Sequence, residues 1–77
     1  MLVSPNPARN VLYVQAKGND AVTVLITDVN GRVLQRQRMI LNGNTSFSVN
    51  VQRLLPGNYY LLVKGKQLQQ VREFIKQ

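Results

Sequence analysis

The chain contains no cysteine and no histidine among its 77 residues. Without cysteine it can form no disulfide and offers no thiolate nucleophile. Without histidine it lacks the commonest general base and metal ligand. Its only carboxylates are Asp20, Asp28 and Glu73, and two scattered aspartates make a poor oxygen-ligand site for a cation. We therefore expect a non-catalytic protein with no cofactor and no metal site.

Long apolar runs are also missing. No run approaches the roughly 18 apolar residues that a transmembrane helix needs, so no membrane span is predicted. The start, Met1-Leu2-Val3, leads directly into Ser4-Pro5-Asn6-Pro7 and has no signal-peptide pattern. The hydrophobic fraction of 44% is nevertheless ordinary for a globular protein. Residues 1–77 are therefore predicted to form one small domain with a thin core.

Basic residues are abundant. Ten lysines and arginines against three acids give a net charge of +7. Such an excess attracts nucleic acid, anionic lipid or an acidic protein, or it simply makes a soluble basic surface. A local cluster comprises Arg32, Arg36 and Arg38. Because aromatic residues are few, a stacking surface for single strands is disfavoured and no nucleic-acid partner is expected.

Turn signals and apolar alternation predict seven short strands and no helix. The central one is expected at Tyr59–Lys64, after a Pro56-Gly57 turn in which glycine takes a positive φ, because both of its faces are mostly apolar. Other turns are expected at Lys17–Asp20, Asp28–Gly31, Asn42-Gly43 and Gly65-Lys66. The remaining strands are expected at Leu2–Val3, Val11–Ala16, Ala21–Asp28, Arg32–Leu41, Thr45–Val51 and Leu68–Ile75. This pattern predicts an all-β fold, a seven-stranded antiparallel immunoglobulin-like β-sandwich.

The strand at Arg32–Leu41 does not fit a simple buried strand. Leu34, Arg36, Arg38 and Ile40 share one face, which cannot be wholly buried. A bulge between Val33 and Met39 would reconcile the apolar ends with the basic middle. Edge strands of such a domain either accept an added strand from a peptide or are merely protected by lysine and proline, and the sequence leaves both open.

The last strand carries Phe74 and Ile75 on opposite faces. The sequence leaves two alternatives. Either one of these residues is exposed for a partner, with Lys76 beside it as a charged contact, or the strand end is buried on both sides. In the first case, a chain that lacks Phe74–Gln77 is expected to keep much of its fold.

Several motifs occur in a fixed order along the whole chain. They are Pro5-Asn6-Pro7, Val22–Leu34 with Asp28 and Gly31, Phe47–Val51, Leu55-Pro56-Gly57 with Tyr59, and the apolar and basic end Glu73–Gln77. In this order and spacing they resemble the type A C-terminal sorting domain of cargo proteins of the type IX secretion system, the Por secretion system. A final Gln77 in place of a basic residue is a mild departure.

The resemblance implies an immunoglobulin-like sandwich at the C-terminal end of a larger exported precursor. Such a domain carries its N-terminally attached cargo through the periplasm and the outer-membrane translocon. A sortase-like surface peptidase then usually removes the domain and anchors the cargo at the cell surface. The residues that the resemblance assigns to translocon recognition are Val71, Arg72, Glu73, Phe74, Ile75, Lys76 and Gln77. The rival interpretations are an immunoglobulin-like surface adhesion or carbohydrate-binding module and a basic nucleic-acid-binding domain.

Overall fold

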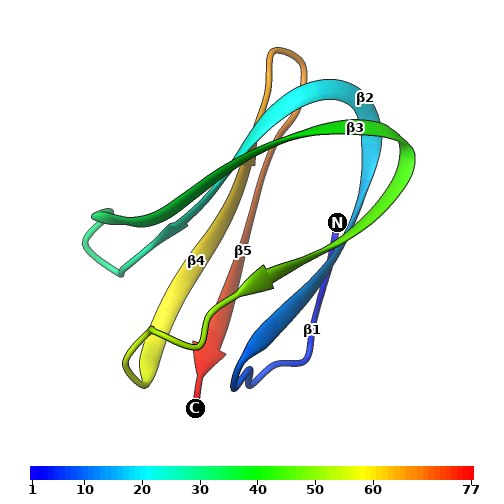
Figure 1. The fold of residues 1–77 in the computed structure, drawn as a ribbon. Helices are drawn as coiled ribbons and strands as arrows, with labels where there is room; N and C mark the ends of the chain where they lie inside the picture. The colour runs from blue at the N-terminus through cyan, green and yellow to red at the C-terminus, as the bar shows by residue number, and fades with distance from the viewer.

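The computed structural model describes all residues from Met1 to Gln77 and contains five strands and no helix. Strand β2 is paired with β1, β3 and β4, strand β5 is paired with β4, and every pair is antiparallel. Figure 1 shows that β2 and β3 arch together, so that one continuous sheet curls back over itself. The strands are β1 (Leu2–Ser4), β2 (Val11–Thr27), β3 (Val33–Asn50), β4 (Gly57–Lys64) and β5 (Gln69–Lys76).

The prediction of seven strands was wrong, because the turns expected at Lys17–Asp20 and Asn42-Gly43 do not form. Strands β2 and β3 continue without interruption through these segments, and their pairing register is unbroken there, with Gly18 opposite Gly43. Both glycines have positive φ, 151° and 74°, which residues with a side chain rarely adopt. The Asn19 side chain accepts a hydrogen bond from the Gly43 amide at 3.1 Å. Turn-forming residues therefore bend two paired strands here instead of reversing them.

The turn between β2 and β3 forms where it was expected. The Asp28 carboxylate accepts hydrogen bonds from the amides of Asn30 and Arg32, both at 2.9 Å. Gly31 takes a φ of 85° and donates its amide to the Asp28 carbonyl. Aspartate and glycine thus perform the turn roles that their residue types favour.

The predicted bulge in the basic strand is confirmed. Ile26 on β2 is opposite Gln35, but its neighbour Thr27 is opposite Val33. Leu34 is therefore the extra residue on β3, within the window expected from the sequence. Beyond the bulge Arg36, Arg38 and Ile40 are exposed, whereas Met39 and Leu41 face the core.

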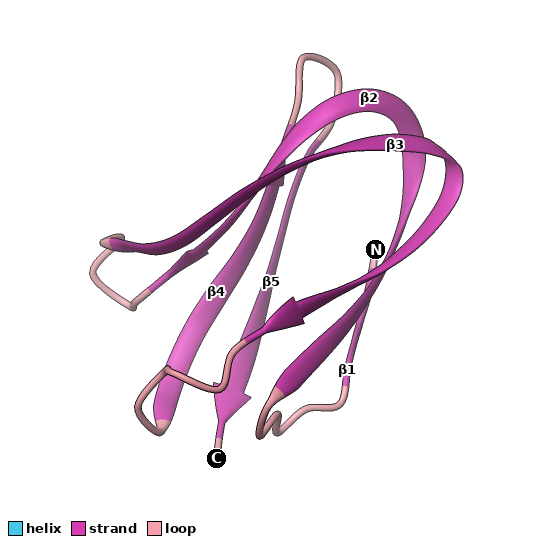
Figure 2. Cartoon of the chain, viewed as in Figure 1, coloured by secondary structure: helices cyan, strands magenta, loops and turns pink.

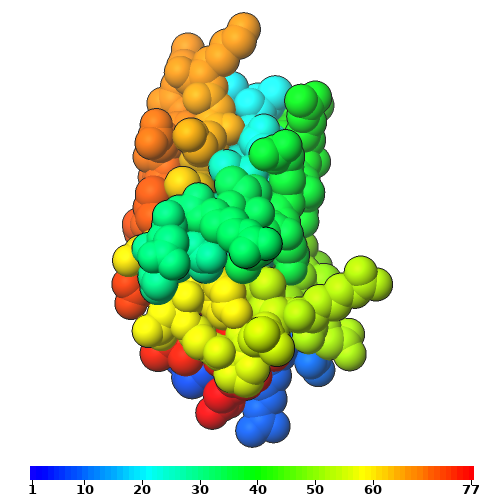
Figure 3. Space-filling model, turned by 90° about the vertical axis from the view of Figure 1, so that its left-hand side faces the viewer, coloured from blue at the N-terminus to red at the C-terminus, as the bar shows by residue number.

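The core fills the space between the two halves of the curled sheet. Burial alternates along β2 and β4, whose inward side chains are buried while most of the alternate residues are exposed or half-buried. Figure 3 shows the β2–β3 turn covering one side of the molecule above the β3–β4 loop. The buried residues are Ala8, Leu12, Val14, Ala16, Val22, Val24, Ile26, Leu41, Val49, Val51, Tyr59, Leu61, Val63 and Phe74.

Asp20 joins the bend of β2 to the β4–β5 turn. This turn closes through the Gly65 amide, which donates to the Leu68 carbonyl at 2.7 Å. The Asp20 carboxylate accepts a hydrogen bond from the Gln67 amide at 2.9 Å. It lies so close to Gly65 that a Cβ at that position would overlap it. The Asp20 carboxylate, like that of Asp28, therefore stabilises a turn by accepting a hydrogen bond from a backbone amide of that turn.

Candidate recognition site at the end of the C-terminal strand

The end of β5 lies where two connecting segments meet. Figure 1 places the C-terminus beside the β1–β2 connection and the β3–β4 loop, all at the lower end of the view. On one side, Gly57 and Tyr59 of β4 are opposite Lys76 and Phe74. On the other side, Ala8 forms a parallel bridge with Lys76. Segments that are far apart in the sequence therefore enclose the strand end from both edges.

The segment Pro5–Ala8, which we name the proline clasp, holds the outer edge of this strand end. The Ile75 amide donates to the Asn6 side-chain oxygen at 2.9 Å, and the Ile75 carbonyl accepts from the Ala8 amide at 2.8 Å. The Gln77 amide donates to the Ala8 carbonyl at 2.8 Å. Two backbone bonds and one side-chain bond thus replace a neighbouring strand, and Ala8 itself is fully buried.

The second segment is the loop before β4. The Tyr59 hydroxyl donates a hydrogen bond to the Leu55 carbonyl, and its ring stacks on Phe74 with a centroid separation of 5.7 Å. Gly57 has the positive φ that was predicted, 155°, but it begins β4. It was wrong to place Gly57 third in a tight Pro-Gly turn, because the hydrogen-bonded turn lies earlier, where the Leu54 amide donates to the Val51 carbonyl.

Three of the family motifs contain turn residues, and two of these three meet at the end of β5. The clasp contains Pro5-Asn6-Pro7, and Leu55 and Pro56 lie in the β3–β4 loop just before Gly57, the first residue of β4. Figure 2 shows the β2–β3 turn, which contains Asp28 and Gly31, as a loop apart from those two. The side chains of Asp28 and the backbone of Gly31 serve their own turn.

The side chains of β5 divide between the core and the outside. Phe74 is fully buried, and Lys76 is 8% exposed with its Nζ donating to the Gln77 backbone oxygen at 2.9 Å. Ile75 is 44% exposed. Of the two alternatives that the sequence left open, one apolar residue facing outward is the correct one, but the expected position of Lys76 beside it was wrong. Because Phe74 belongs to the core, we expect a chain without Phe74–Gln77 to lose part of its stability as well as the strand end.

Ile75 is part of an apolar stripe on the outer face of the β4–β5 pair. Val71, on the same face of β5, is 43% exposed and lies opposite Leu62. Tyr60 and Leu62 of β4 are half-buried on this face. Glu73 lies between Val71 and Ile75, opposite Tyr60. This face combines accessible apolar side chains with one carboxylate, a composition suited to contact with another protein.

Ala8 and Arg9 were not singled out from the sequence. The Arg9 Nε donates to the Gln77 side-chain oxygen at 3.3 Å, which adds a further contact to the strand end. Ala8 acts through its backbone and its small size, neither of which makes a recognisable motif. The only available signal was its position directly after Pro5-Asn6-Pro7.

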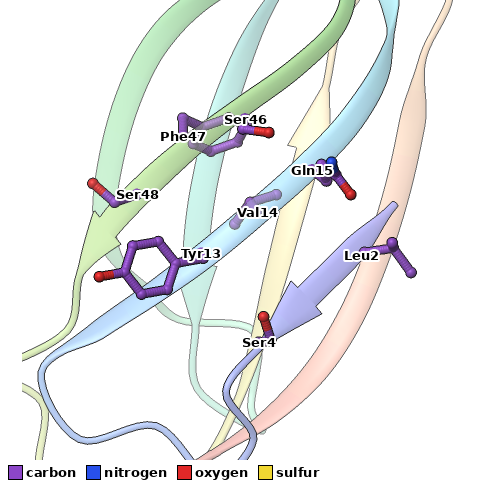
Figure 4. A pocket seen from close by; sticks show the side chains of 8 residues that line it. All are labelled: Leu2, Ser4, Tyr13, Val14, Gln15, Ser46, Phe47 and Ser48. Atoms are coloured by element: carbon purple, nitrogen blue, oxygen red, sulfur yellow. The ribbon is translucent and has the colours of Figure 1, made fainter.

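Clusters of metal-ligating side chains and surface hollows are the other features that could form a functional site. The chain has no cluster of three or more side chains suited to a metal ion. A shallow hollow lies on the outer face of β1, the first half of β2 and the second half of β3 (Figure 4). Tyr13 provides its only titratable side chain. The residues that line it are Leu2, Ser4, Tyr13, Val14, Gln15, Ser46, Phe47 and Ser48.

Comparison with known protein families identifies the chain. The model of the family described as "Secretion system C-terminal sorting domain" matches residues 2–77. The chain belongs to this family. The match confirms the resemblance to sorting domains of the type IX secretion system. No curated protein and no solved structure matches the sequence. This sorting domain has no helix with the length and apolar character that crossing a membrane requires.

Proposed function

We propose that this sorting domain is a non-catalytic signal that directs an N-terminally attached cargo through the type IX outer-membrane translocon. The observation that supports this function is the family match over residues 2–77. We further propose that translocon proteins recognise the last strand, Val71–Gln77. The convergence of the proline clasp and the β3–β4 loop on this strand end supports that assignment, because a strand held in one conformation loses less entropy when it binds a partner.

The residues of the proposed site divide into two roles. The exposed side chains of Val71, Arg72, Glu73, Ile75 and Gln77 are available to a partner. Phe74 and Lys76 face inward and act as anchors that hold the strand in place. The signature residues of the clasp and the loop support the strand end without being the contact surface themselves.

We also propose the later steps that the family resemblance implies. After transit through the periplasm, a sortase-like peptidase removes the domain and the cargo is anchored at the cell surface or released. No observation on this chain favours the alternative of an adhesion or carbohydrate-binding module. The one hollow with several hydroxyl groups is shallow, and of its two aromatic residues Tyr13 is exposed and Phe47 is half-buried.

The immunoglobulin-like relationship is part of the proposal. If the bends at Gly18 and Gly43 are counted as boundaries, β2 and β3 each supply two segments, and the five strands become seven. The hydrogen bond from the Tyr59 hydroxyl to the Leu55 carbonyl is of the kind found at the tyrosine corner of immunoglobulin-like domains. Both features support an immunoglobulin-like ancestry for the curled sheet.

A fusion experiment tests the sorting function. Residues 1–77, preceded by a native linker, are fused to a periplasmic reporter in a host that has the type IX machinery. We expect the reporter to reach the cell surface or the medium, as judged by its accessibility to added protease. The matched control is the same fusion with Phe74→Ala, which removes a core anchor. A reporter that remains periplasmic, while a native cargo of the same cell is exported, refutes the proposal.

A further inference from the structure

The outer edge of β3 is the longest unpaired strand edge in the molecule. Strand β3 is paired only with β2 along its whole length, Val33–Asn50. Figure 1 shows it following the outside of the curled sheet. The end of β5, by contrast, is covered by the proline clasp, and β1 has only three residues. An antiparallel edge leaves alternate N–H and C=O groups pointing outward, so β3 offers a backbone template for another strand.

The first half of this edge also carries a distinctive row of side chains, Arg36, Arg38 and Ile40, which we name the arginine row and which begins after the bulge at Leu34. The two arginines are exposed, and Ile40 is 75% exposed. The β2 residues opposite the arginines are Leu25 and Thr23. No carboxylate therefore faces either guanidinium across the ladder, and the row presents two positive charges followed by one exposed apolar side chain, Ile40.

We propose that the edge of β3 along the arginine row binds an extended acidic segment of a partner protein as an added strand. Side chains on one face of a strand recur every second residue. A segment with two acids spaced by one residue, and an apolar residue two positions further on, would place a carboxylate near each guanidinium. It would also place an apolar side chain near Ile40. Opposite charges across neighbouring strands favour pairing, and outward backbone groups supply the hydrogen bonds.

A second copy of this chain does not fit the same edge. Its three acids, Asp20, Asp28 and Glu73, are isolated in the sequence, and Asp20 and Asp28 already hold turns. Two copies paired through this edge would instead bring arginines of one copy close to arginines of the other, which is unfavourable. The charge pattern thus selects a different protein over self-association.

The experiment uses the 77-residue chain and a synthetic seven-residue peptide. The peptide has valine at its first and seventh positions and glutamate at its third and fifth positions. Threonine occupies the three positions between these residues. One control peptide has lysine in place of both glutamates. Two others keep the glutamates but are N-methylated on one or the other alternate set of backbone amides. Binding is measured from the backbone amide signals in NMR spectra at low ionic strength.

We expect the glutamate peptide to bind at least about tenfold more tightly than the lysine peptide, with signal changes concentrated in Val33–Leu41 and its partner β2. At least one N-methylated peptide should lose binding, since it lacks the donors of an added strand. The double variant Arg36→Glu with Arg38→Glu should reverse the preference. The double variant Lys17→Glu with Lys66→Glu, which has the same net charge but changes exposed residues of the β2 bend and the β4–β5 turn, should not.

Three results would overturn the proposal. The first is equal binding of both N-methylated peptides and the parent, because attraction would then be purely electrostatic. The second is a set of signal changes centred on β1 or β5. The third is no binding of the glutamate peptide at all, in which case the arginines only protect the edge from pairing.

Discussion

Replacing Phe74 and replacing its neighbour Ile75 should have very different consequences. Phe74 is fully buried and stacks on Tyr59. Removal of such a ring, as in Phe74→Ala, costs about 3–5 kcal/mol in a core. Ile75 is 44% exposed, and the substitution Ile75→Ala should cost less than about 1.5 kcal/mol, because much of its side chain already contacts water. Neither substitution removes the amide or the carbonyl with which Ile75 binds the clasp.

The scale of the whole domain makes this difference visible. At about 0.05–0.15 kcal/mol per residue, a domain of this size has a free energy of unfolding of roughly 4–12 kcal/mol. Phe74→Ala therefore removes a large share of it, and Ile75→Ala a small one. Urea unfolding followed by circular dichroism measures both. For a small domain with a slope of about 1–2 kcal/mol per molar urea, we expect the Phe74→Ala midpoint to fall by about 2 M or more, or the variant to be unfolded without urea.

The Ile75→Ala midpoint should fall by less than about 1 M with an unchanged slope. Similar losses in the two variants would refute the division of β5 into a buried anchor and an exposed contact face. A fully stable Phe74→Ala variant would show that the ring does not lie in the core.

Two further predictions concern the stability of glycine variants. Gly57→Val should cost about 1–3 kcal/mol, because φ at this position is 155° and a β-branched residue is strained there; an unchanged melting temperature would contradict the backbone conformation. Gly65→Ala should lower the melting temperature, because the new Cβ overlaps the Asp20 carboxylate. In a double-mutant cycle, Gly65→Ala should cost less when Asp20→Ala is already present, and strictly additive losses would show that the two residues do not touch.

The sequence predicted the strands better than their connections. Alternation correctly indicated strands in the segments that form β2 and β4. It left open which face of β4 points inward, because both of its faces are mostly apolar. The Asp28–Gly31 turn was predictable, since its carboxylate and glycine have strictly local roles. The bends at Gly18 and Gly43 were mistaken for turns. A glycine with positive φ serves a bend and a hairpin equally well, and only the long-range pairing of β2 with β3 decides between them.

The candidate site was predictable only in part. The family motifs pointed to the last strand, and the opposite faces of Phe74 and Ile75 followed from the strand period. Which of the two faces outward depends on the curl of the whole sheet. The clasp could not be predicted for a different reason. Its hydrogen bonds join Asn6 and Ala8 to residues almost seventy positions away in the sequence. Most of these bonds use backbone groups, which every residue type has, so no residue pattern indicates them.

The central claim is that the exposed face of β5 is recognised during export independently of its part in the fold. The most direct test compares two double variants of the reporter fusion. Val71→Thr with Ile75→Thr removes the exposed apolar contacts of β5 but keeps β-branched residues. Leu2→Thr with Val29→Thr removes two apolar residues that are 69% and 62% exposed elsewhere. Surface exposure of the reporter is measured together with the urea midpoint of each domain. We predict that the β5 variant loses at least about 90% of export while its midpoint stays within about 1 M of the parent, and that the control is exported normally. Normal export of the β5 variant would contradict the claim.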